Sequence, residues 1–229
     1  MNKKLSLTIT IVFLATLALS GSVAMALAPL GTPTADLKAG QFGVGVDYAY
    51  DSTKIKIDNV TDRLKTNTIL ANLGYGVTDD LKGFVRLGMG DGKIDEFNGD
   101  YKFAWGFGTK YTFLKQDKLD WGALFQMNWL RSEDTIAGDT VKLRPYDITV
   151  AVGPNYQVSE SFSIYGGPLL QFVRGSMSSG GEAGGIREKS MFGGYVGAQA
   201  ALCPVTSIYG EYQYTGSGWG IGTGITWKF

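Results

Sequence analysis

The feature that most constrains the fold is a strict two-residue alternation, which is clearest from Tyr101 to Phe113. Odd positions there carry Tyr, Phe or Trp apart from Thr109, and even positions carry Lys, Ala, Gly or Thr. Side chains of a β-strand point alternately to its two faces. The stretch therefore predicts a strand with one bulky apolar face and one face of small and basic residues.

The same alternation recurs between turn-like segments along the chain, which predicts an all-β protein. The expected strands are 41–51, 66–77, 81–90, 101–113, 119–131, 142–157, 162–176, 189–203, 206–215 and 218–229. Short connections at 78–80, 115–118, 159–161 and 204–205 alternate with longer ones at 52–65, 91–100, 132–141 and 177–188. This order is typical of an antiparallel up-and-down transmembrane β-barrel with short periplasmic turns and long outer loops. We expect ten strands, with eight as the alternative, because the last outer connection (215–218) is short.

The strand expected at 218–229 indicates which face meets lipid. Its bulky residues share one face and its glycines the other, together with Lys228. A closed barrel of this size has little room inside, so the small residues belong in the lumen and the bulky face needs a nonaqueous surrounding. Turning Lys102 and Lys110 of the 101–113 strand toward lipid would cost roughly 2–4 kcal/mol each at the midplane, so the register is strongly specified.

One segment fits the strand pattern poorly. Pro154 and Pro168 fall within expected strands, and Pro168 follows two glycines. Proline cannot donate to the hydrogen-bond ladder, so we expect a bulge or kink at 166–168.

The N-terminus has the features of an export signal. Lys3 and Lys4 precede an apolar run that ends near Leu19, and 24–26 read Ala-Met-Ala. This pattern predicts a signal peptide at 1–26 with cleavage after Ala26, with a retained membrane anchor as the alternative. We expect 27–39 to be an N-terminal periplasmic lead and 40–229 to be the barrel.

Two motifs carry a family resemblance: "LGYGVTDDLKGFVRLGMG" in the hairpin at 73–90, and the terminal "GIGTGITWKF". With the signal peptide, they resemble OmpA-like and related small outer-membrane β-barrel proteins, in which eight strands are usual. The resemblance implies the bacterial outer membrane, barrel-assembly machinery as a partner during biogenesis, and an assembly signal at Ile225, Trp227 and Phe229. We expect no peptidoglycan-binding domain after the barrel, so the resemblance does not imply an anchoring role.

Charged residues on the small-residue face are expected to line the lumen. These are Asp47, Lys82, Arg86, Lys102, Lys110, Asp120, Asp147, Glu211 and Lys228. A buried charge is costly unless it is paired, so opposite charges at similar heights should form salt bridges. The network then either plugs the lumen of a structural or surface-interaction barrel, or sets the selectivity of a small porin-like pore or carrier for small solutes.

Three arginines on the bulky face lie at the outer ends of expected strands: Arg131, Arg144 and Arg174. They are expected to contact lipopolysaccharide phosphates, because guanidinium binds phosphate in bidentate fashion; unspecific rim charge is the alternative. The surface ligand of the outer loops is left open.

Composition narrows the remaining function classes. Formal charge is zero, from 21 Lys+Arg and 21 Asp+Glu, which does not favour nucleic-acid binding. The chain has no His, so barrel hydrolases that depend on a His base are not expected, and we expect no catalytic residues. Cys203 is the one cysteine, so neither a disulfide framework nor a His/Cys metal site is expected, and no cofactor is implied.

Overall fold

The computed structural model describes residues 28–57, 60–94, 97–136, 138–179, 182–188 and 191–229, and the expected signal peptide lies outside them. Every regular element in these ranges is a strand. They are β1 (Phe42–Ile57), β2 (Val60–Gly76), β3 (Leu81–Ile94), β4 (Phe97–Asn98), β5 (Asp100–Gln116), β6 (Leu119–Ile136), β7 (Asp139–Ser159), β8 (Phe162–Ser179), β9 (Glu182–Glu188), β10 (Phe192–Cys203), β11 (Thr206–Thr215) and β12 (Gly218–Lys228). Within these same ranges there is no helix of the length and apolar character that crossing a membrane requires.

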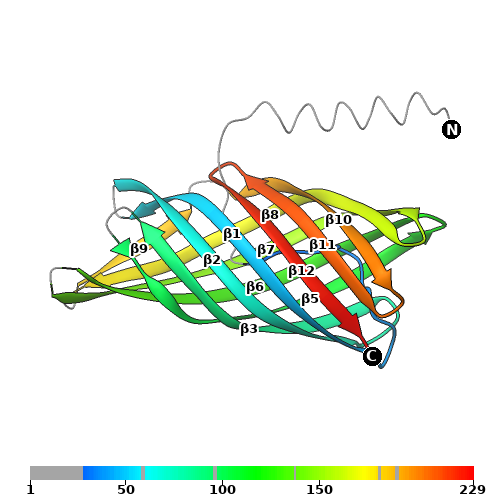
Figure 1. Ribbon diagram of the computed structural model, residues 1–229. Helices are drawn as coiled ribbons and strands as arrows, with labels where there is room; N and C mark the ends of the chain where they lie inside the picture. The colour runs from blue at the N-terminus through cyan, green and yellow to red at the C-terminus, as the bar shows by residue number, and fades with distance from the viewer. Residues whose placement is uncertain (1–27, 58–59, 95–96, 137, 180–181, 189–190) are drawn as a thin grey trace.

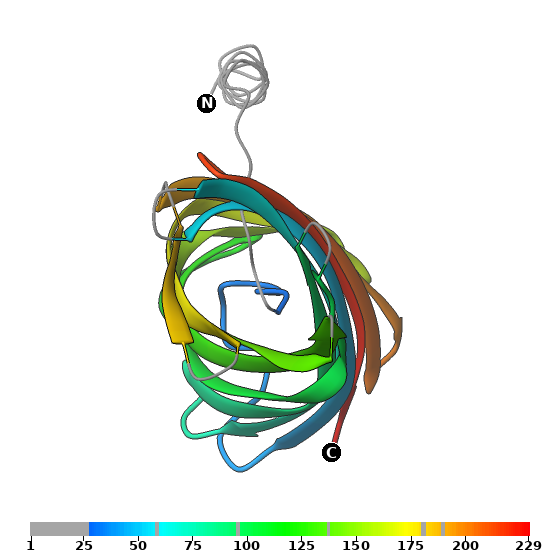
Figure 2. The same ribbon diagram turned by 90° about the vertical axis from the view of Figure 1, so that its left-hand side faces the viewer.

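Ten of the described strands form a closed antiparallel barrel, and neighbours in the barrel are neighbours in sequence (Figures 1 and 2). Closure occurs where β12 pairs with β1, for example Trp227 with Val44. The backbones of Phe42 and Phe229 complete this seam with two mutual hydrogen bonds. The expected strand count of ten is confirmed, and the seam leaves no open edge that lipid would have to solvate.

The three strands β10, β11 and β12 stop short of the outer end of the barrel. There the short strand β9 fills the gap that they leave between β8 and β1. It pairs with β8 on one side and with β1 on the other, with Arg187 opposite both Arg174 and Lys56. Along the described residues, the outer end of the wall is therefore built from eight strands, whereas the rest is built from ten.

The expectation of long outer loops was wrong. Most residues in the four connecting ranges belong to strands, because β1 runs to Ile57, β2 starts at Val60, and β3, β6, β7 and β8 also extend into these ranges. Alternation continues there with its polarity inverted: Lys54 and Lys56 are exposed, whereas Ile55 is fully buried. The outward face of this outer section is polar, as in a soluble barrel.

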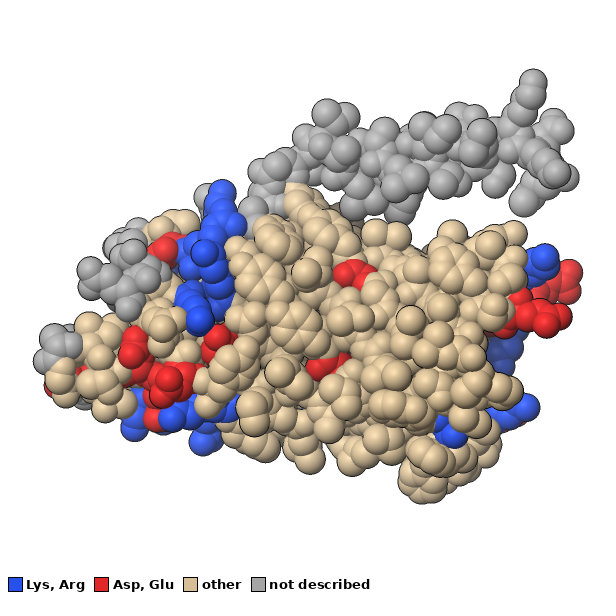
Figure 3. Space-filling model, in the orientation of Figure 1, with Lys and Arg blue, Asp and Glu red and all other residues tan. Residues whose placement is uncertain are grey.

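An apolar core fills the outer section. Its buried members include Ile55, Leu64, Ile94, Phe97, Leu130, Val141, Leu143, Val173 and Ile186. Further toward the other end, the outward face carries a ring of exposed apolar side chains, here called the apolar belt, including Val44, Val46, Leu73, Val85, Phe107, Val150, Ile208 and Ile221. Figure 3 shows this belt as an almost uncharged band between two charged ends. The chain therefore presents its apolar residues outward in the belt and inward beyond it.

The proline-containing segment keeps its alternation. Leu169, Gln171 and Val173 are all buried, and β7 pairs with β8 in the same register on both sides of 166–168. The expected bulge at this point is not found. Instead the β7–β8 ladder has no paired residues at 152–154 and 166–168, where Pro154 and Pro168 cannot donate a hydrogen bond. The strands stay close there, since a Cβ on Gly153 would meet the Gly166 carbonyl.

Candidate functional site

The segment expected to be a periplasmic lead instead enters the barrel. Residues 28–34 and Leu37 are buried, and Figure 2 shows this segment inside the ring of strands. The N-terminal segment is defined here as residues 28–38. It lies in the lumen, from the middle of the barrel to the end that carries the short connections between strands, here called the turn end (Figure 1). The candidate site is therefore the lumen wall together with this segment.

Arg86 of β3 is the centre of the luminal network and is 1% exposed. Its Nε donates to Asp47 Oδ2 at 2.9 Å, Nη1 donates to Gln126 Oε1 at 2.9 Å, and Nη2 donates to the carbonyl of Pro29 at 2.8 Å. One guanidinium thus joins three strands of the wall and the N-terminal segment. The planar fork of arginine suits such a junction, which lysine could not reproduce.

Asp47 of β1 accepts from three partners. Besides Arg86, these are Asn72 Nδ2 at 3.0 Å and the Tyr209 hydroxyl at 2.7 Å. All the donors lie on the wall, on β2, β3 and β11. A buried carboxylate with this many partners is well compensated for its lost hydration.

Glu211 of β11 holds the N-terminal segment by its backbone. Its Oε1 accepts from the Leu30 amide at 2.6 Å and its Oε2 from the Gly31 amide at 2.7 Å. Gln213 and Tyr165 donate to the same carboxylate at 2.6 and 3.2 Å. Gly31 adopts φ of 67°, the left-handed region in which glycine is favoured, and this turn presents both amides to one side chain.

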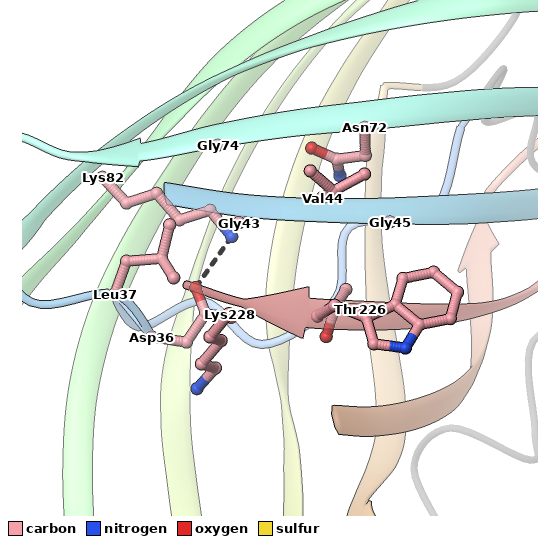
Figure 4. Close-up of a pocket in the computed structure, with 11 residues that line it drawn as sticks. Asp36, Leu37, Gly43, Val44, Gly45, Asn72, Gly74, Lys82, Thr226 and Lys228 are labelled. Carbon is pink, nitrogen blue, oxygen red and sulfur yellow. Dashed lines mark hydrogen bonds and ion pairs between the residues drawn. The ribbon is translucent and has the colours of Figure 1, made fainter. Parts of the chain in front are cut away.

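A second ion pair lies at the turn end of the lumen (Figure 4). Lys82 Nζ lies 2.8 Å from Asp36 Oδ1 of the N-terminal segment. Burial alone would raise the pKa of the Asp36 carboxyl, but the charges of Lys82, Lys110 and Lys228 outweigh it and hold that pKa well below its usual range. Leu37 packs over Gly43, where a Cβ would lie 3.2 Å from the leucine methyl.

Asp147 of β7 is fully buried and forms no ion pair within 4 Å in the described part of the chain. Its carboxylate accepts from Asn128 Nδ2 at 3.1 Å and Thr149 Oγ1 at 2.9 Å. Amide and hydroxyl donors replace water there without a counter-ion. Asp147 is thus part of the luminal polar layer but outside the Arg86 cluster.

The nine expected luminal charges do not act as one network. Arg86–Asp47 is the one ion pair between two of them among the described residues. Lys82 pairs with the N-terminal segment instead, and Lys110 and Lys228 lie beside the same segment. Asp120 is partly exposed at the turn end of β6. Lys102 lies beside a β-bulge, and its side chain is 41% exposed and reaches the exposed Asp100 at 3.9 Å.

Sequence reasoning missed Pro29, Leu30, Gly31 and Asp36 as site residues. The segment shows no alternation, and a carboxylate such as Glu211 can be satisfied by backbone amides that no side-chain pattern reveals. One usable signal was present: the inward face of the expected strands carried five cations but four carboxylates, so the cations could not all pair with luminal carboxylates.

Two small cavities lie beside the N-terminal segment in the lumen. A cavity bounded by Leu30, Asp36 and Tyr209 has a volume of about 20 Å³, and another beside Gly43 and Thr226 has about 10 Å³. About 10–15 Å³ is needed for one water molecule, so neither cavity exceeds one or two waters.

On the outward face, Arg131, Arg144 and Arg174 are exposed as expected. They lie within β6, β7 and β8 rather than at their ends, since those strands continue outward. Arg131 and Arg144 border a hollow of about 310 Å³ that is also lined by Trp105, Trp129 and Pro145. The two tryptophans stack at 4.2 Å between ring centroids.

The family model for the outer membrane protein β-barrel domain matches residues 13–224. The chain belongs to this family. It is accordingly an integral membrane protein of the bacterial outer membrane, as the terminal motif and the hairpin at 73–90 indicated. No curated protein of similar sequence was found.

Solved structures with the same fold differ widely in sequence. The outer membrane protease OmpT from Escherichia coli is 9% identical, with TM-score 0.50, over 82% of this chain and 96% of that one. An outer membrane channel from Pseudomonas putida F1 is 13% identical, with TM-score 0.47, over 88% and 99%. Ail, the attachment invasion locus protein of Yersinia pestis, is 16% identical, with TM-score 0.46, over 83% and 99%. At these identities the likeness concerns the fold alone.

Proposed function

We propose that the protein is a structural or surface-interaction barrel whose lumen is closed, and that it is not an enzyme. The observation that carries this proposal is the N-terminal segment, which is bound in the lumen by Glu211, Arg86 and Lys82. Each contact involves a charged group, and such hydrogen bonds are stronger than those between neutral groups.

The apolar core of the outer section supports the same proposal. A solute that passed the N-terminal segment would meet the buried side chains of Leu64, Leu130 and Leu143. Packed apolar side chains exclude water, and hydrophobic constrictions block conduction by dewetting. Two closures of different chemistry therefore lie in series along the barrel.

The non-enzymatic assignment rests on the available chemistry. The sequence has no His, and the described carboxylates in the lumen are held by hydrogen bonds or ion pairs rather than facing an open cleft. The proposal includes export by a cleaved signal peptide at 1–26 and insertion by barrel-assembly machinery that recognises Ile225, Trp227 and Phe229. Ile225 and Trp227 are partly exposed on the outward face, and Phe229 is 75% exposed at the chain end.

Planar-bilayer recording tests the closed lumen. The protein without residues 1–26 should show no channels above background. A variant that also lacks 27–38 should remain closed, because the apolar core is intact. Removing 27–38 and replacing Leu64, Leu130 and Leu143 by Ser should open both closures and give measurable current. Steady channels from the unaltered barrel would contradict the proposal.

A small pore for solutes is the second candidate, favoured by the cations at the turn end of the lumen. Lys82, Lys110 and Lys228 lie close enough to Asp36 for their charges to lower its pKa. In this alternative, departure of the N-terminal segment would expose an anion-attracting mouth. Anion-selective current from the variant lacking 27–38 alone would favour the pore over the closed barrel.

A further inference from the structure

A stripe of cations crosses the outward face where the apolar belt ends. The basic stripe is defined by Arg63 of β2, Lys54 and Lys56 of β1, Arg187 of β9 and Arg174 of β8. Lys54 lies directly opposite Arg63, Lys56 opposite Arg187, and Arg187 opposite Arg174. Four strands thus contribute a continuous row of like charges. Figure 3 shows Lys and Arg side chains gathered where the belt ends.

Such a row is unfavourable in isolation. Like charges directly opposite one another destabilise a sheet, and opposite charges are normally placed there instead. None of the five cations forms an ion pair with a carboxylate in the described part of the chain. Within the described residues the stripe therefore has no counter-charge of its own, and a bound anion would supply one.

The position of the stripe indicates where that anion comes from. On β1, Val46 and Tyr48 are exposed in the belt, and the next exposed outward side chains along the strand are Lys54 and Lys56. These cations therefore lie at the height of the lipid headgroups rather than at the tip of the molecule. Lysines and arginines at this height attract anionic headgroups.

The stripe continues toward the hollow beside Trp105 and Trp129. Arg174 pairs across the sheet with Tyr146, and Arg144 and Arg131 follow on β7 and β6. The hollow lies where the β5–β6 ladder shifts register between Tyr101 and Ala104 and where β6 and β7 have no paired residues at 130–131 and 144–145. It combines two guanidinium groups with an apolar aromatic floor, which suits a molecule that is part phosphate and part hydrocarbon.

We propose that the basic stripe and the adjoining hollow bind a phosphorylated glycolipid of the outer leaflet, of the lipid A type. Its phosphates neutralise the opposed cations, and its apolar part lies against the stacked tryptophans. The proposal extends the expectation for Arg131, Arg144 and Arg174 to Lys54, Lys56, Arg63 and Arg187, and it does not depend on whether the lumen is closed.

The test is titration of the purified barrel in zwitterionic detergent with lipid A carrying both phosphates, followed by native mass spectrometry. The variant is the combined Lys54→Gln, Lys56→Gln, Arg174→Gln and Arg187→Gln. With roughly a fivefold contribution per cation, its affinity should fall on the order of 10²–10³-fold. The matched control, Lys115→Gln with Lys118→Gln at the opposite end, should bind as the unaltered protein does, and dephosphorylated lipid A should bind weakly to all three.

A second readout separates lost binding from misfolding. Without lipid A, the quadruple variant should unfold at the same or a higher temperature than the unaltered protein, because opposed like charges have been removed. Lipid A should raise the unfolding temperature of the unaltered protein and not that of the variant. Unchanged lipid A affinity in the variant would overturn the proposal, and so would heparin, a soluble polyanion, binding the unaltered protein as tightly as lipid A does.

Discussion

At the residue scale, the lumen contains buried charged groups, and specific hydrogen-bond or ion-pair partners offset the cost of burying each of them. Arg86 has contacts to Asp47, Gln126 and Pro29, and its guanidinium also lies 4.8 Å from the centre of the Phe84 ring. Asp47 would lose its cation if the arginine were removed, while remaining buried. The free energy of unfolding should therefore respond more to the loss of one partner than to the loss of both.

Replacing Arg86 by Met should lower the free energy of unfolding by about 3–5 kcal/mol, because it leaves a buried carboxylate without its ion pair. The combination of Arg86→Met with Asp47→Leu should recover a large part of this loss. Urea titration of the barrel in lipid vesicles measures both. Lys115→Met, which removes an ion pair at the exposed turn end, is the control and should change little. Equal losses in the single and double variants would contradict this account.

The Asp36–Lys82 pair makes docking of the N-terminal segment dependent on pH. The pKa of Asp36 is lowered in the folded state, so its stabilising contribution is complete above its unfolded value of roughly 4 and is lost as pH falls below that value. Protease cleavage within 28–38 should therefore remain slow down to about pH 4 and accelerate below it. Asp36→Asn should show faster cleavage at pH 7 and a weaker pH dependence. A cleavage rate that is independent of pH in the unaltered protein would refute this.

At the element scale, strands continue beyond the apolar belt with their polarity reversed. The same parity that points Leu70 into the lumen also points Leu64 inward, but there the outward neighbours are Arg63 and Lys65 instead of lipid-facing residues. The surrounding medium changes along the strand, so the residue pattern changes although the backbone does not.

A cavity-forming substitution in the outer section distinguishes a packed strand from a loop. Leu64→Ala should lower the free energy of unfolding by about 2–5 kcal/mol, the range for buried leucines. Lys65→Ala, its exposed neighbour, should leave the free energy of unfolding almost unchanged. Chemical denaturation in vesicles compares the two. Equal, negligible effects would mean that 52–65 behaves as a loop.

Sequence alone could predict the strands of the apolar belt because the same two-residue alternation, with the bulky apolar side chains facing lipid, continues throughout them. Tyr101 to Phe113 is an example, as is the closing strand that ends at Phe229. The outer extensions escaped prediction because the sequence Lys54-Ile55-Lys56-Ile57 alternates in the opposite sense, which resembles a polar loop if lipid is assumed to lie outside. Placement of the N-terminal segment depends on backbone amides meeting Glu211, a contact that has no sequence period.

At the scale of the whole molecule, the barrel has two sections with different interiors. The section inside the apolar belt encloses polar side chains and the N-terminal segment, and the outer section encloses an apolar core with a polar exterior. The boundary between the two coincides with the ends of β10 to β12, with the entry of β9 into the wall, and with the basic stripe. In the proposed function the interior is closed, so the outer surface makes the contacts with other molecules.

The central claim is that residues 28–38 lie inside the barrel, and thiol accessibility in the folded protein tests it most directly. In a Cys203→Ser background, Thr32→Cys places a thiol at a position that is 5% exposed, whereas Ala39→Cys places one at an exposed position nearby. A membrane-impermeant maleimide should label Cys at 39 at least about tenfold faster than Cys at 32, because labelling of the latter requires the segment to leave the lumen. Equal labelling rates in the intact barrel would contradict the account.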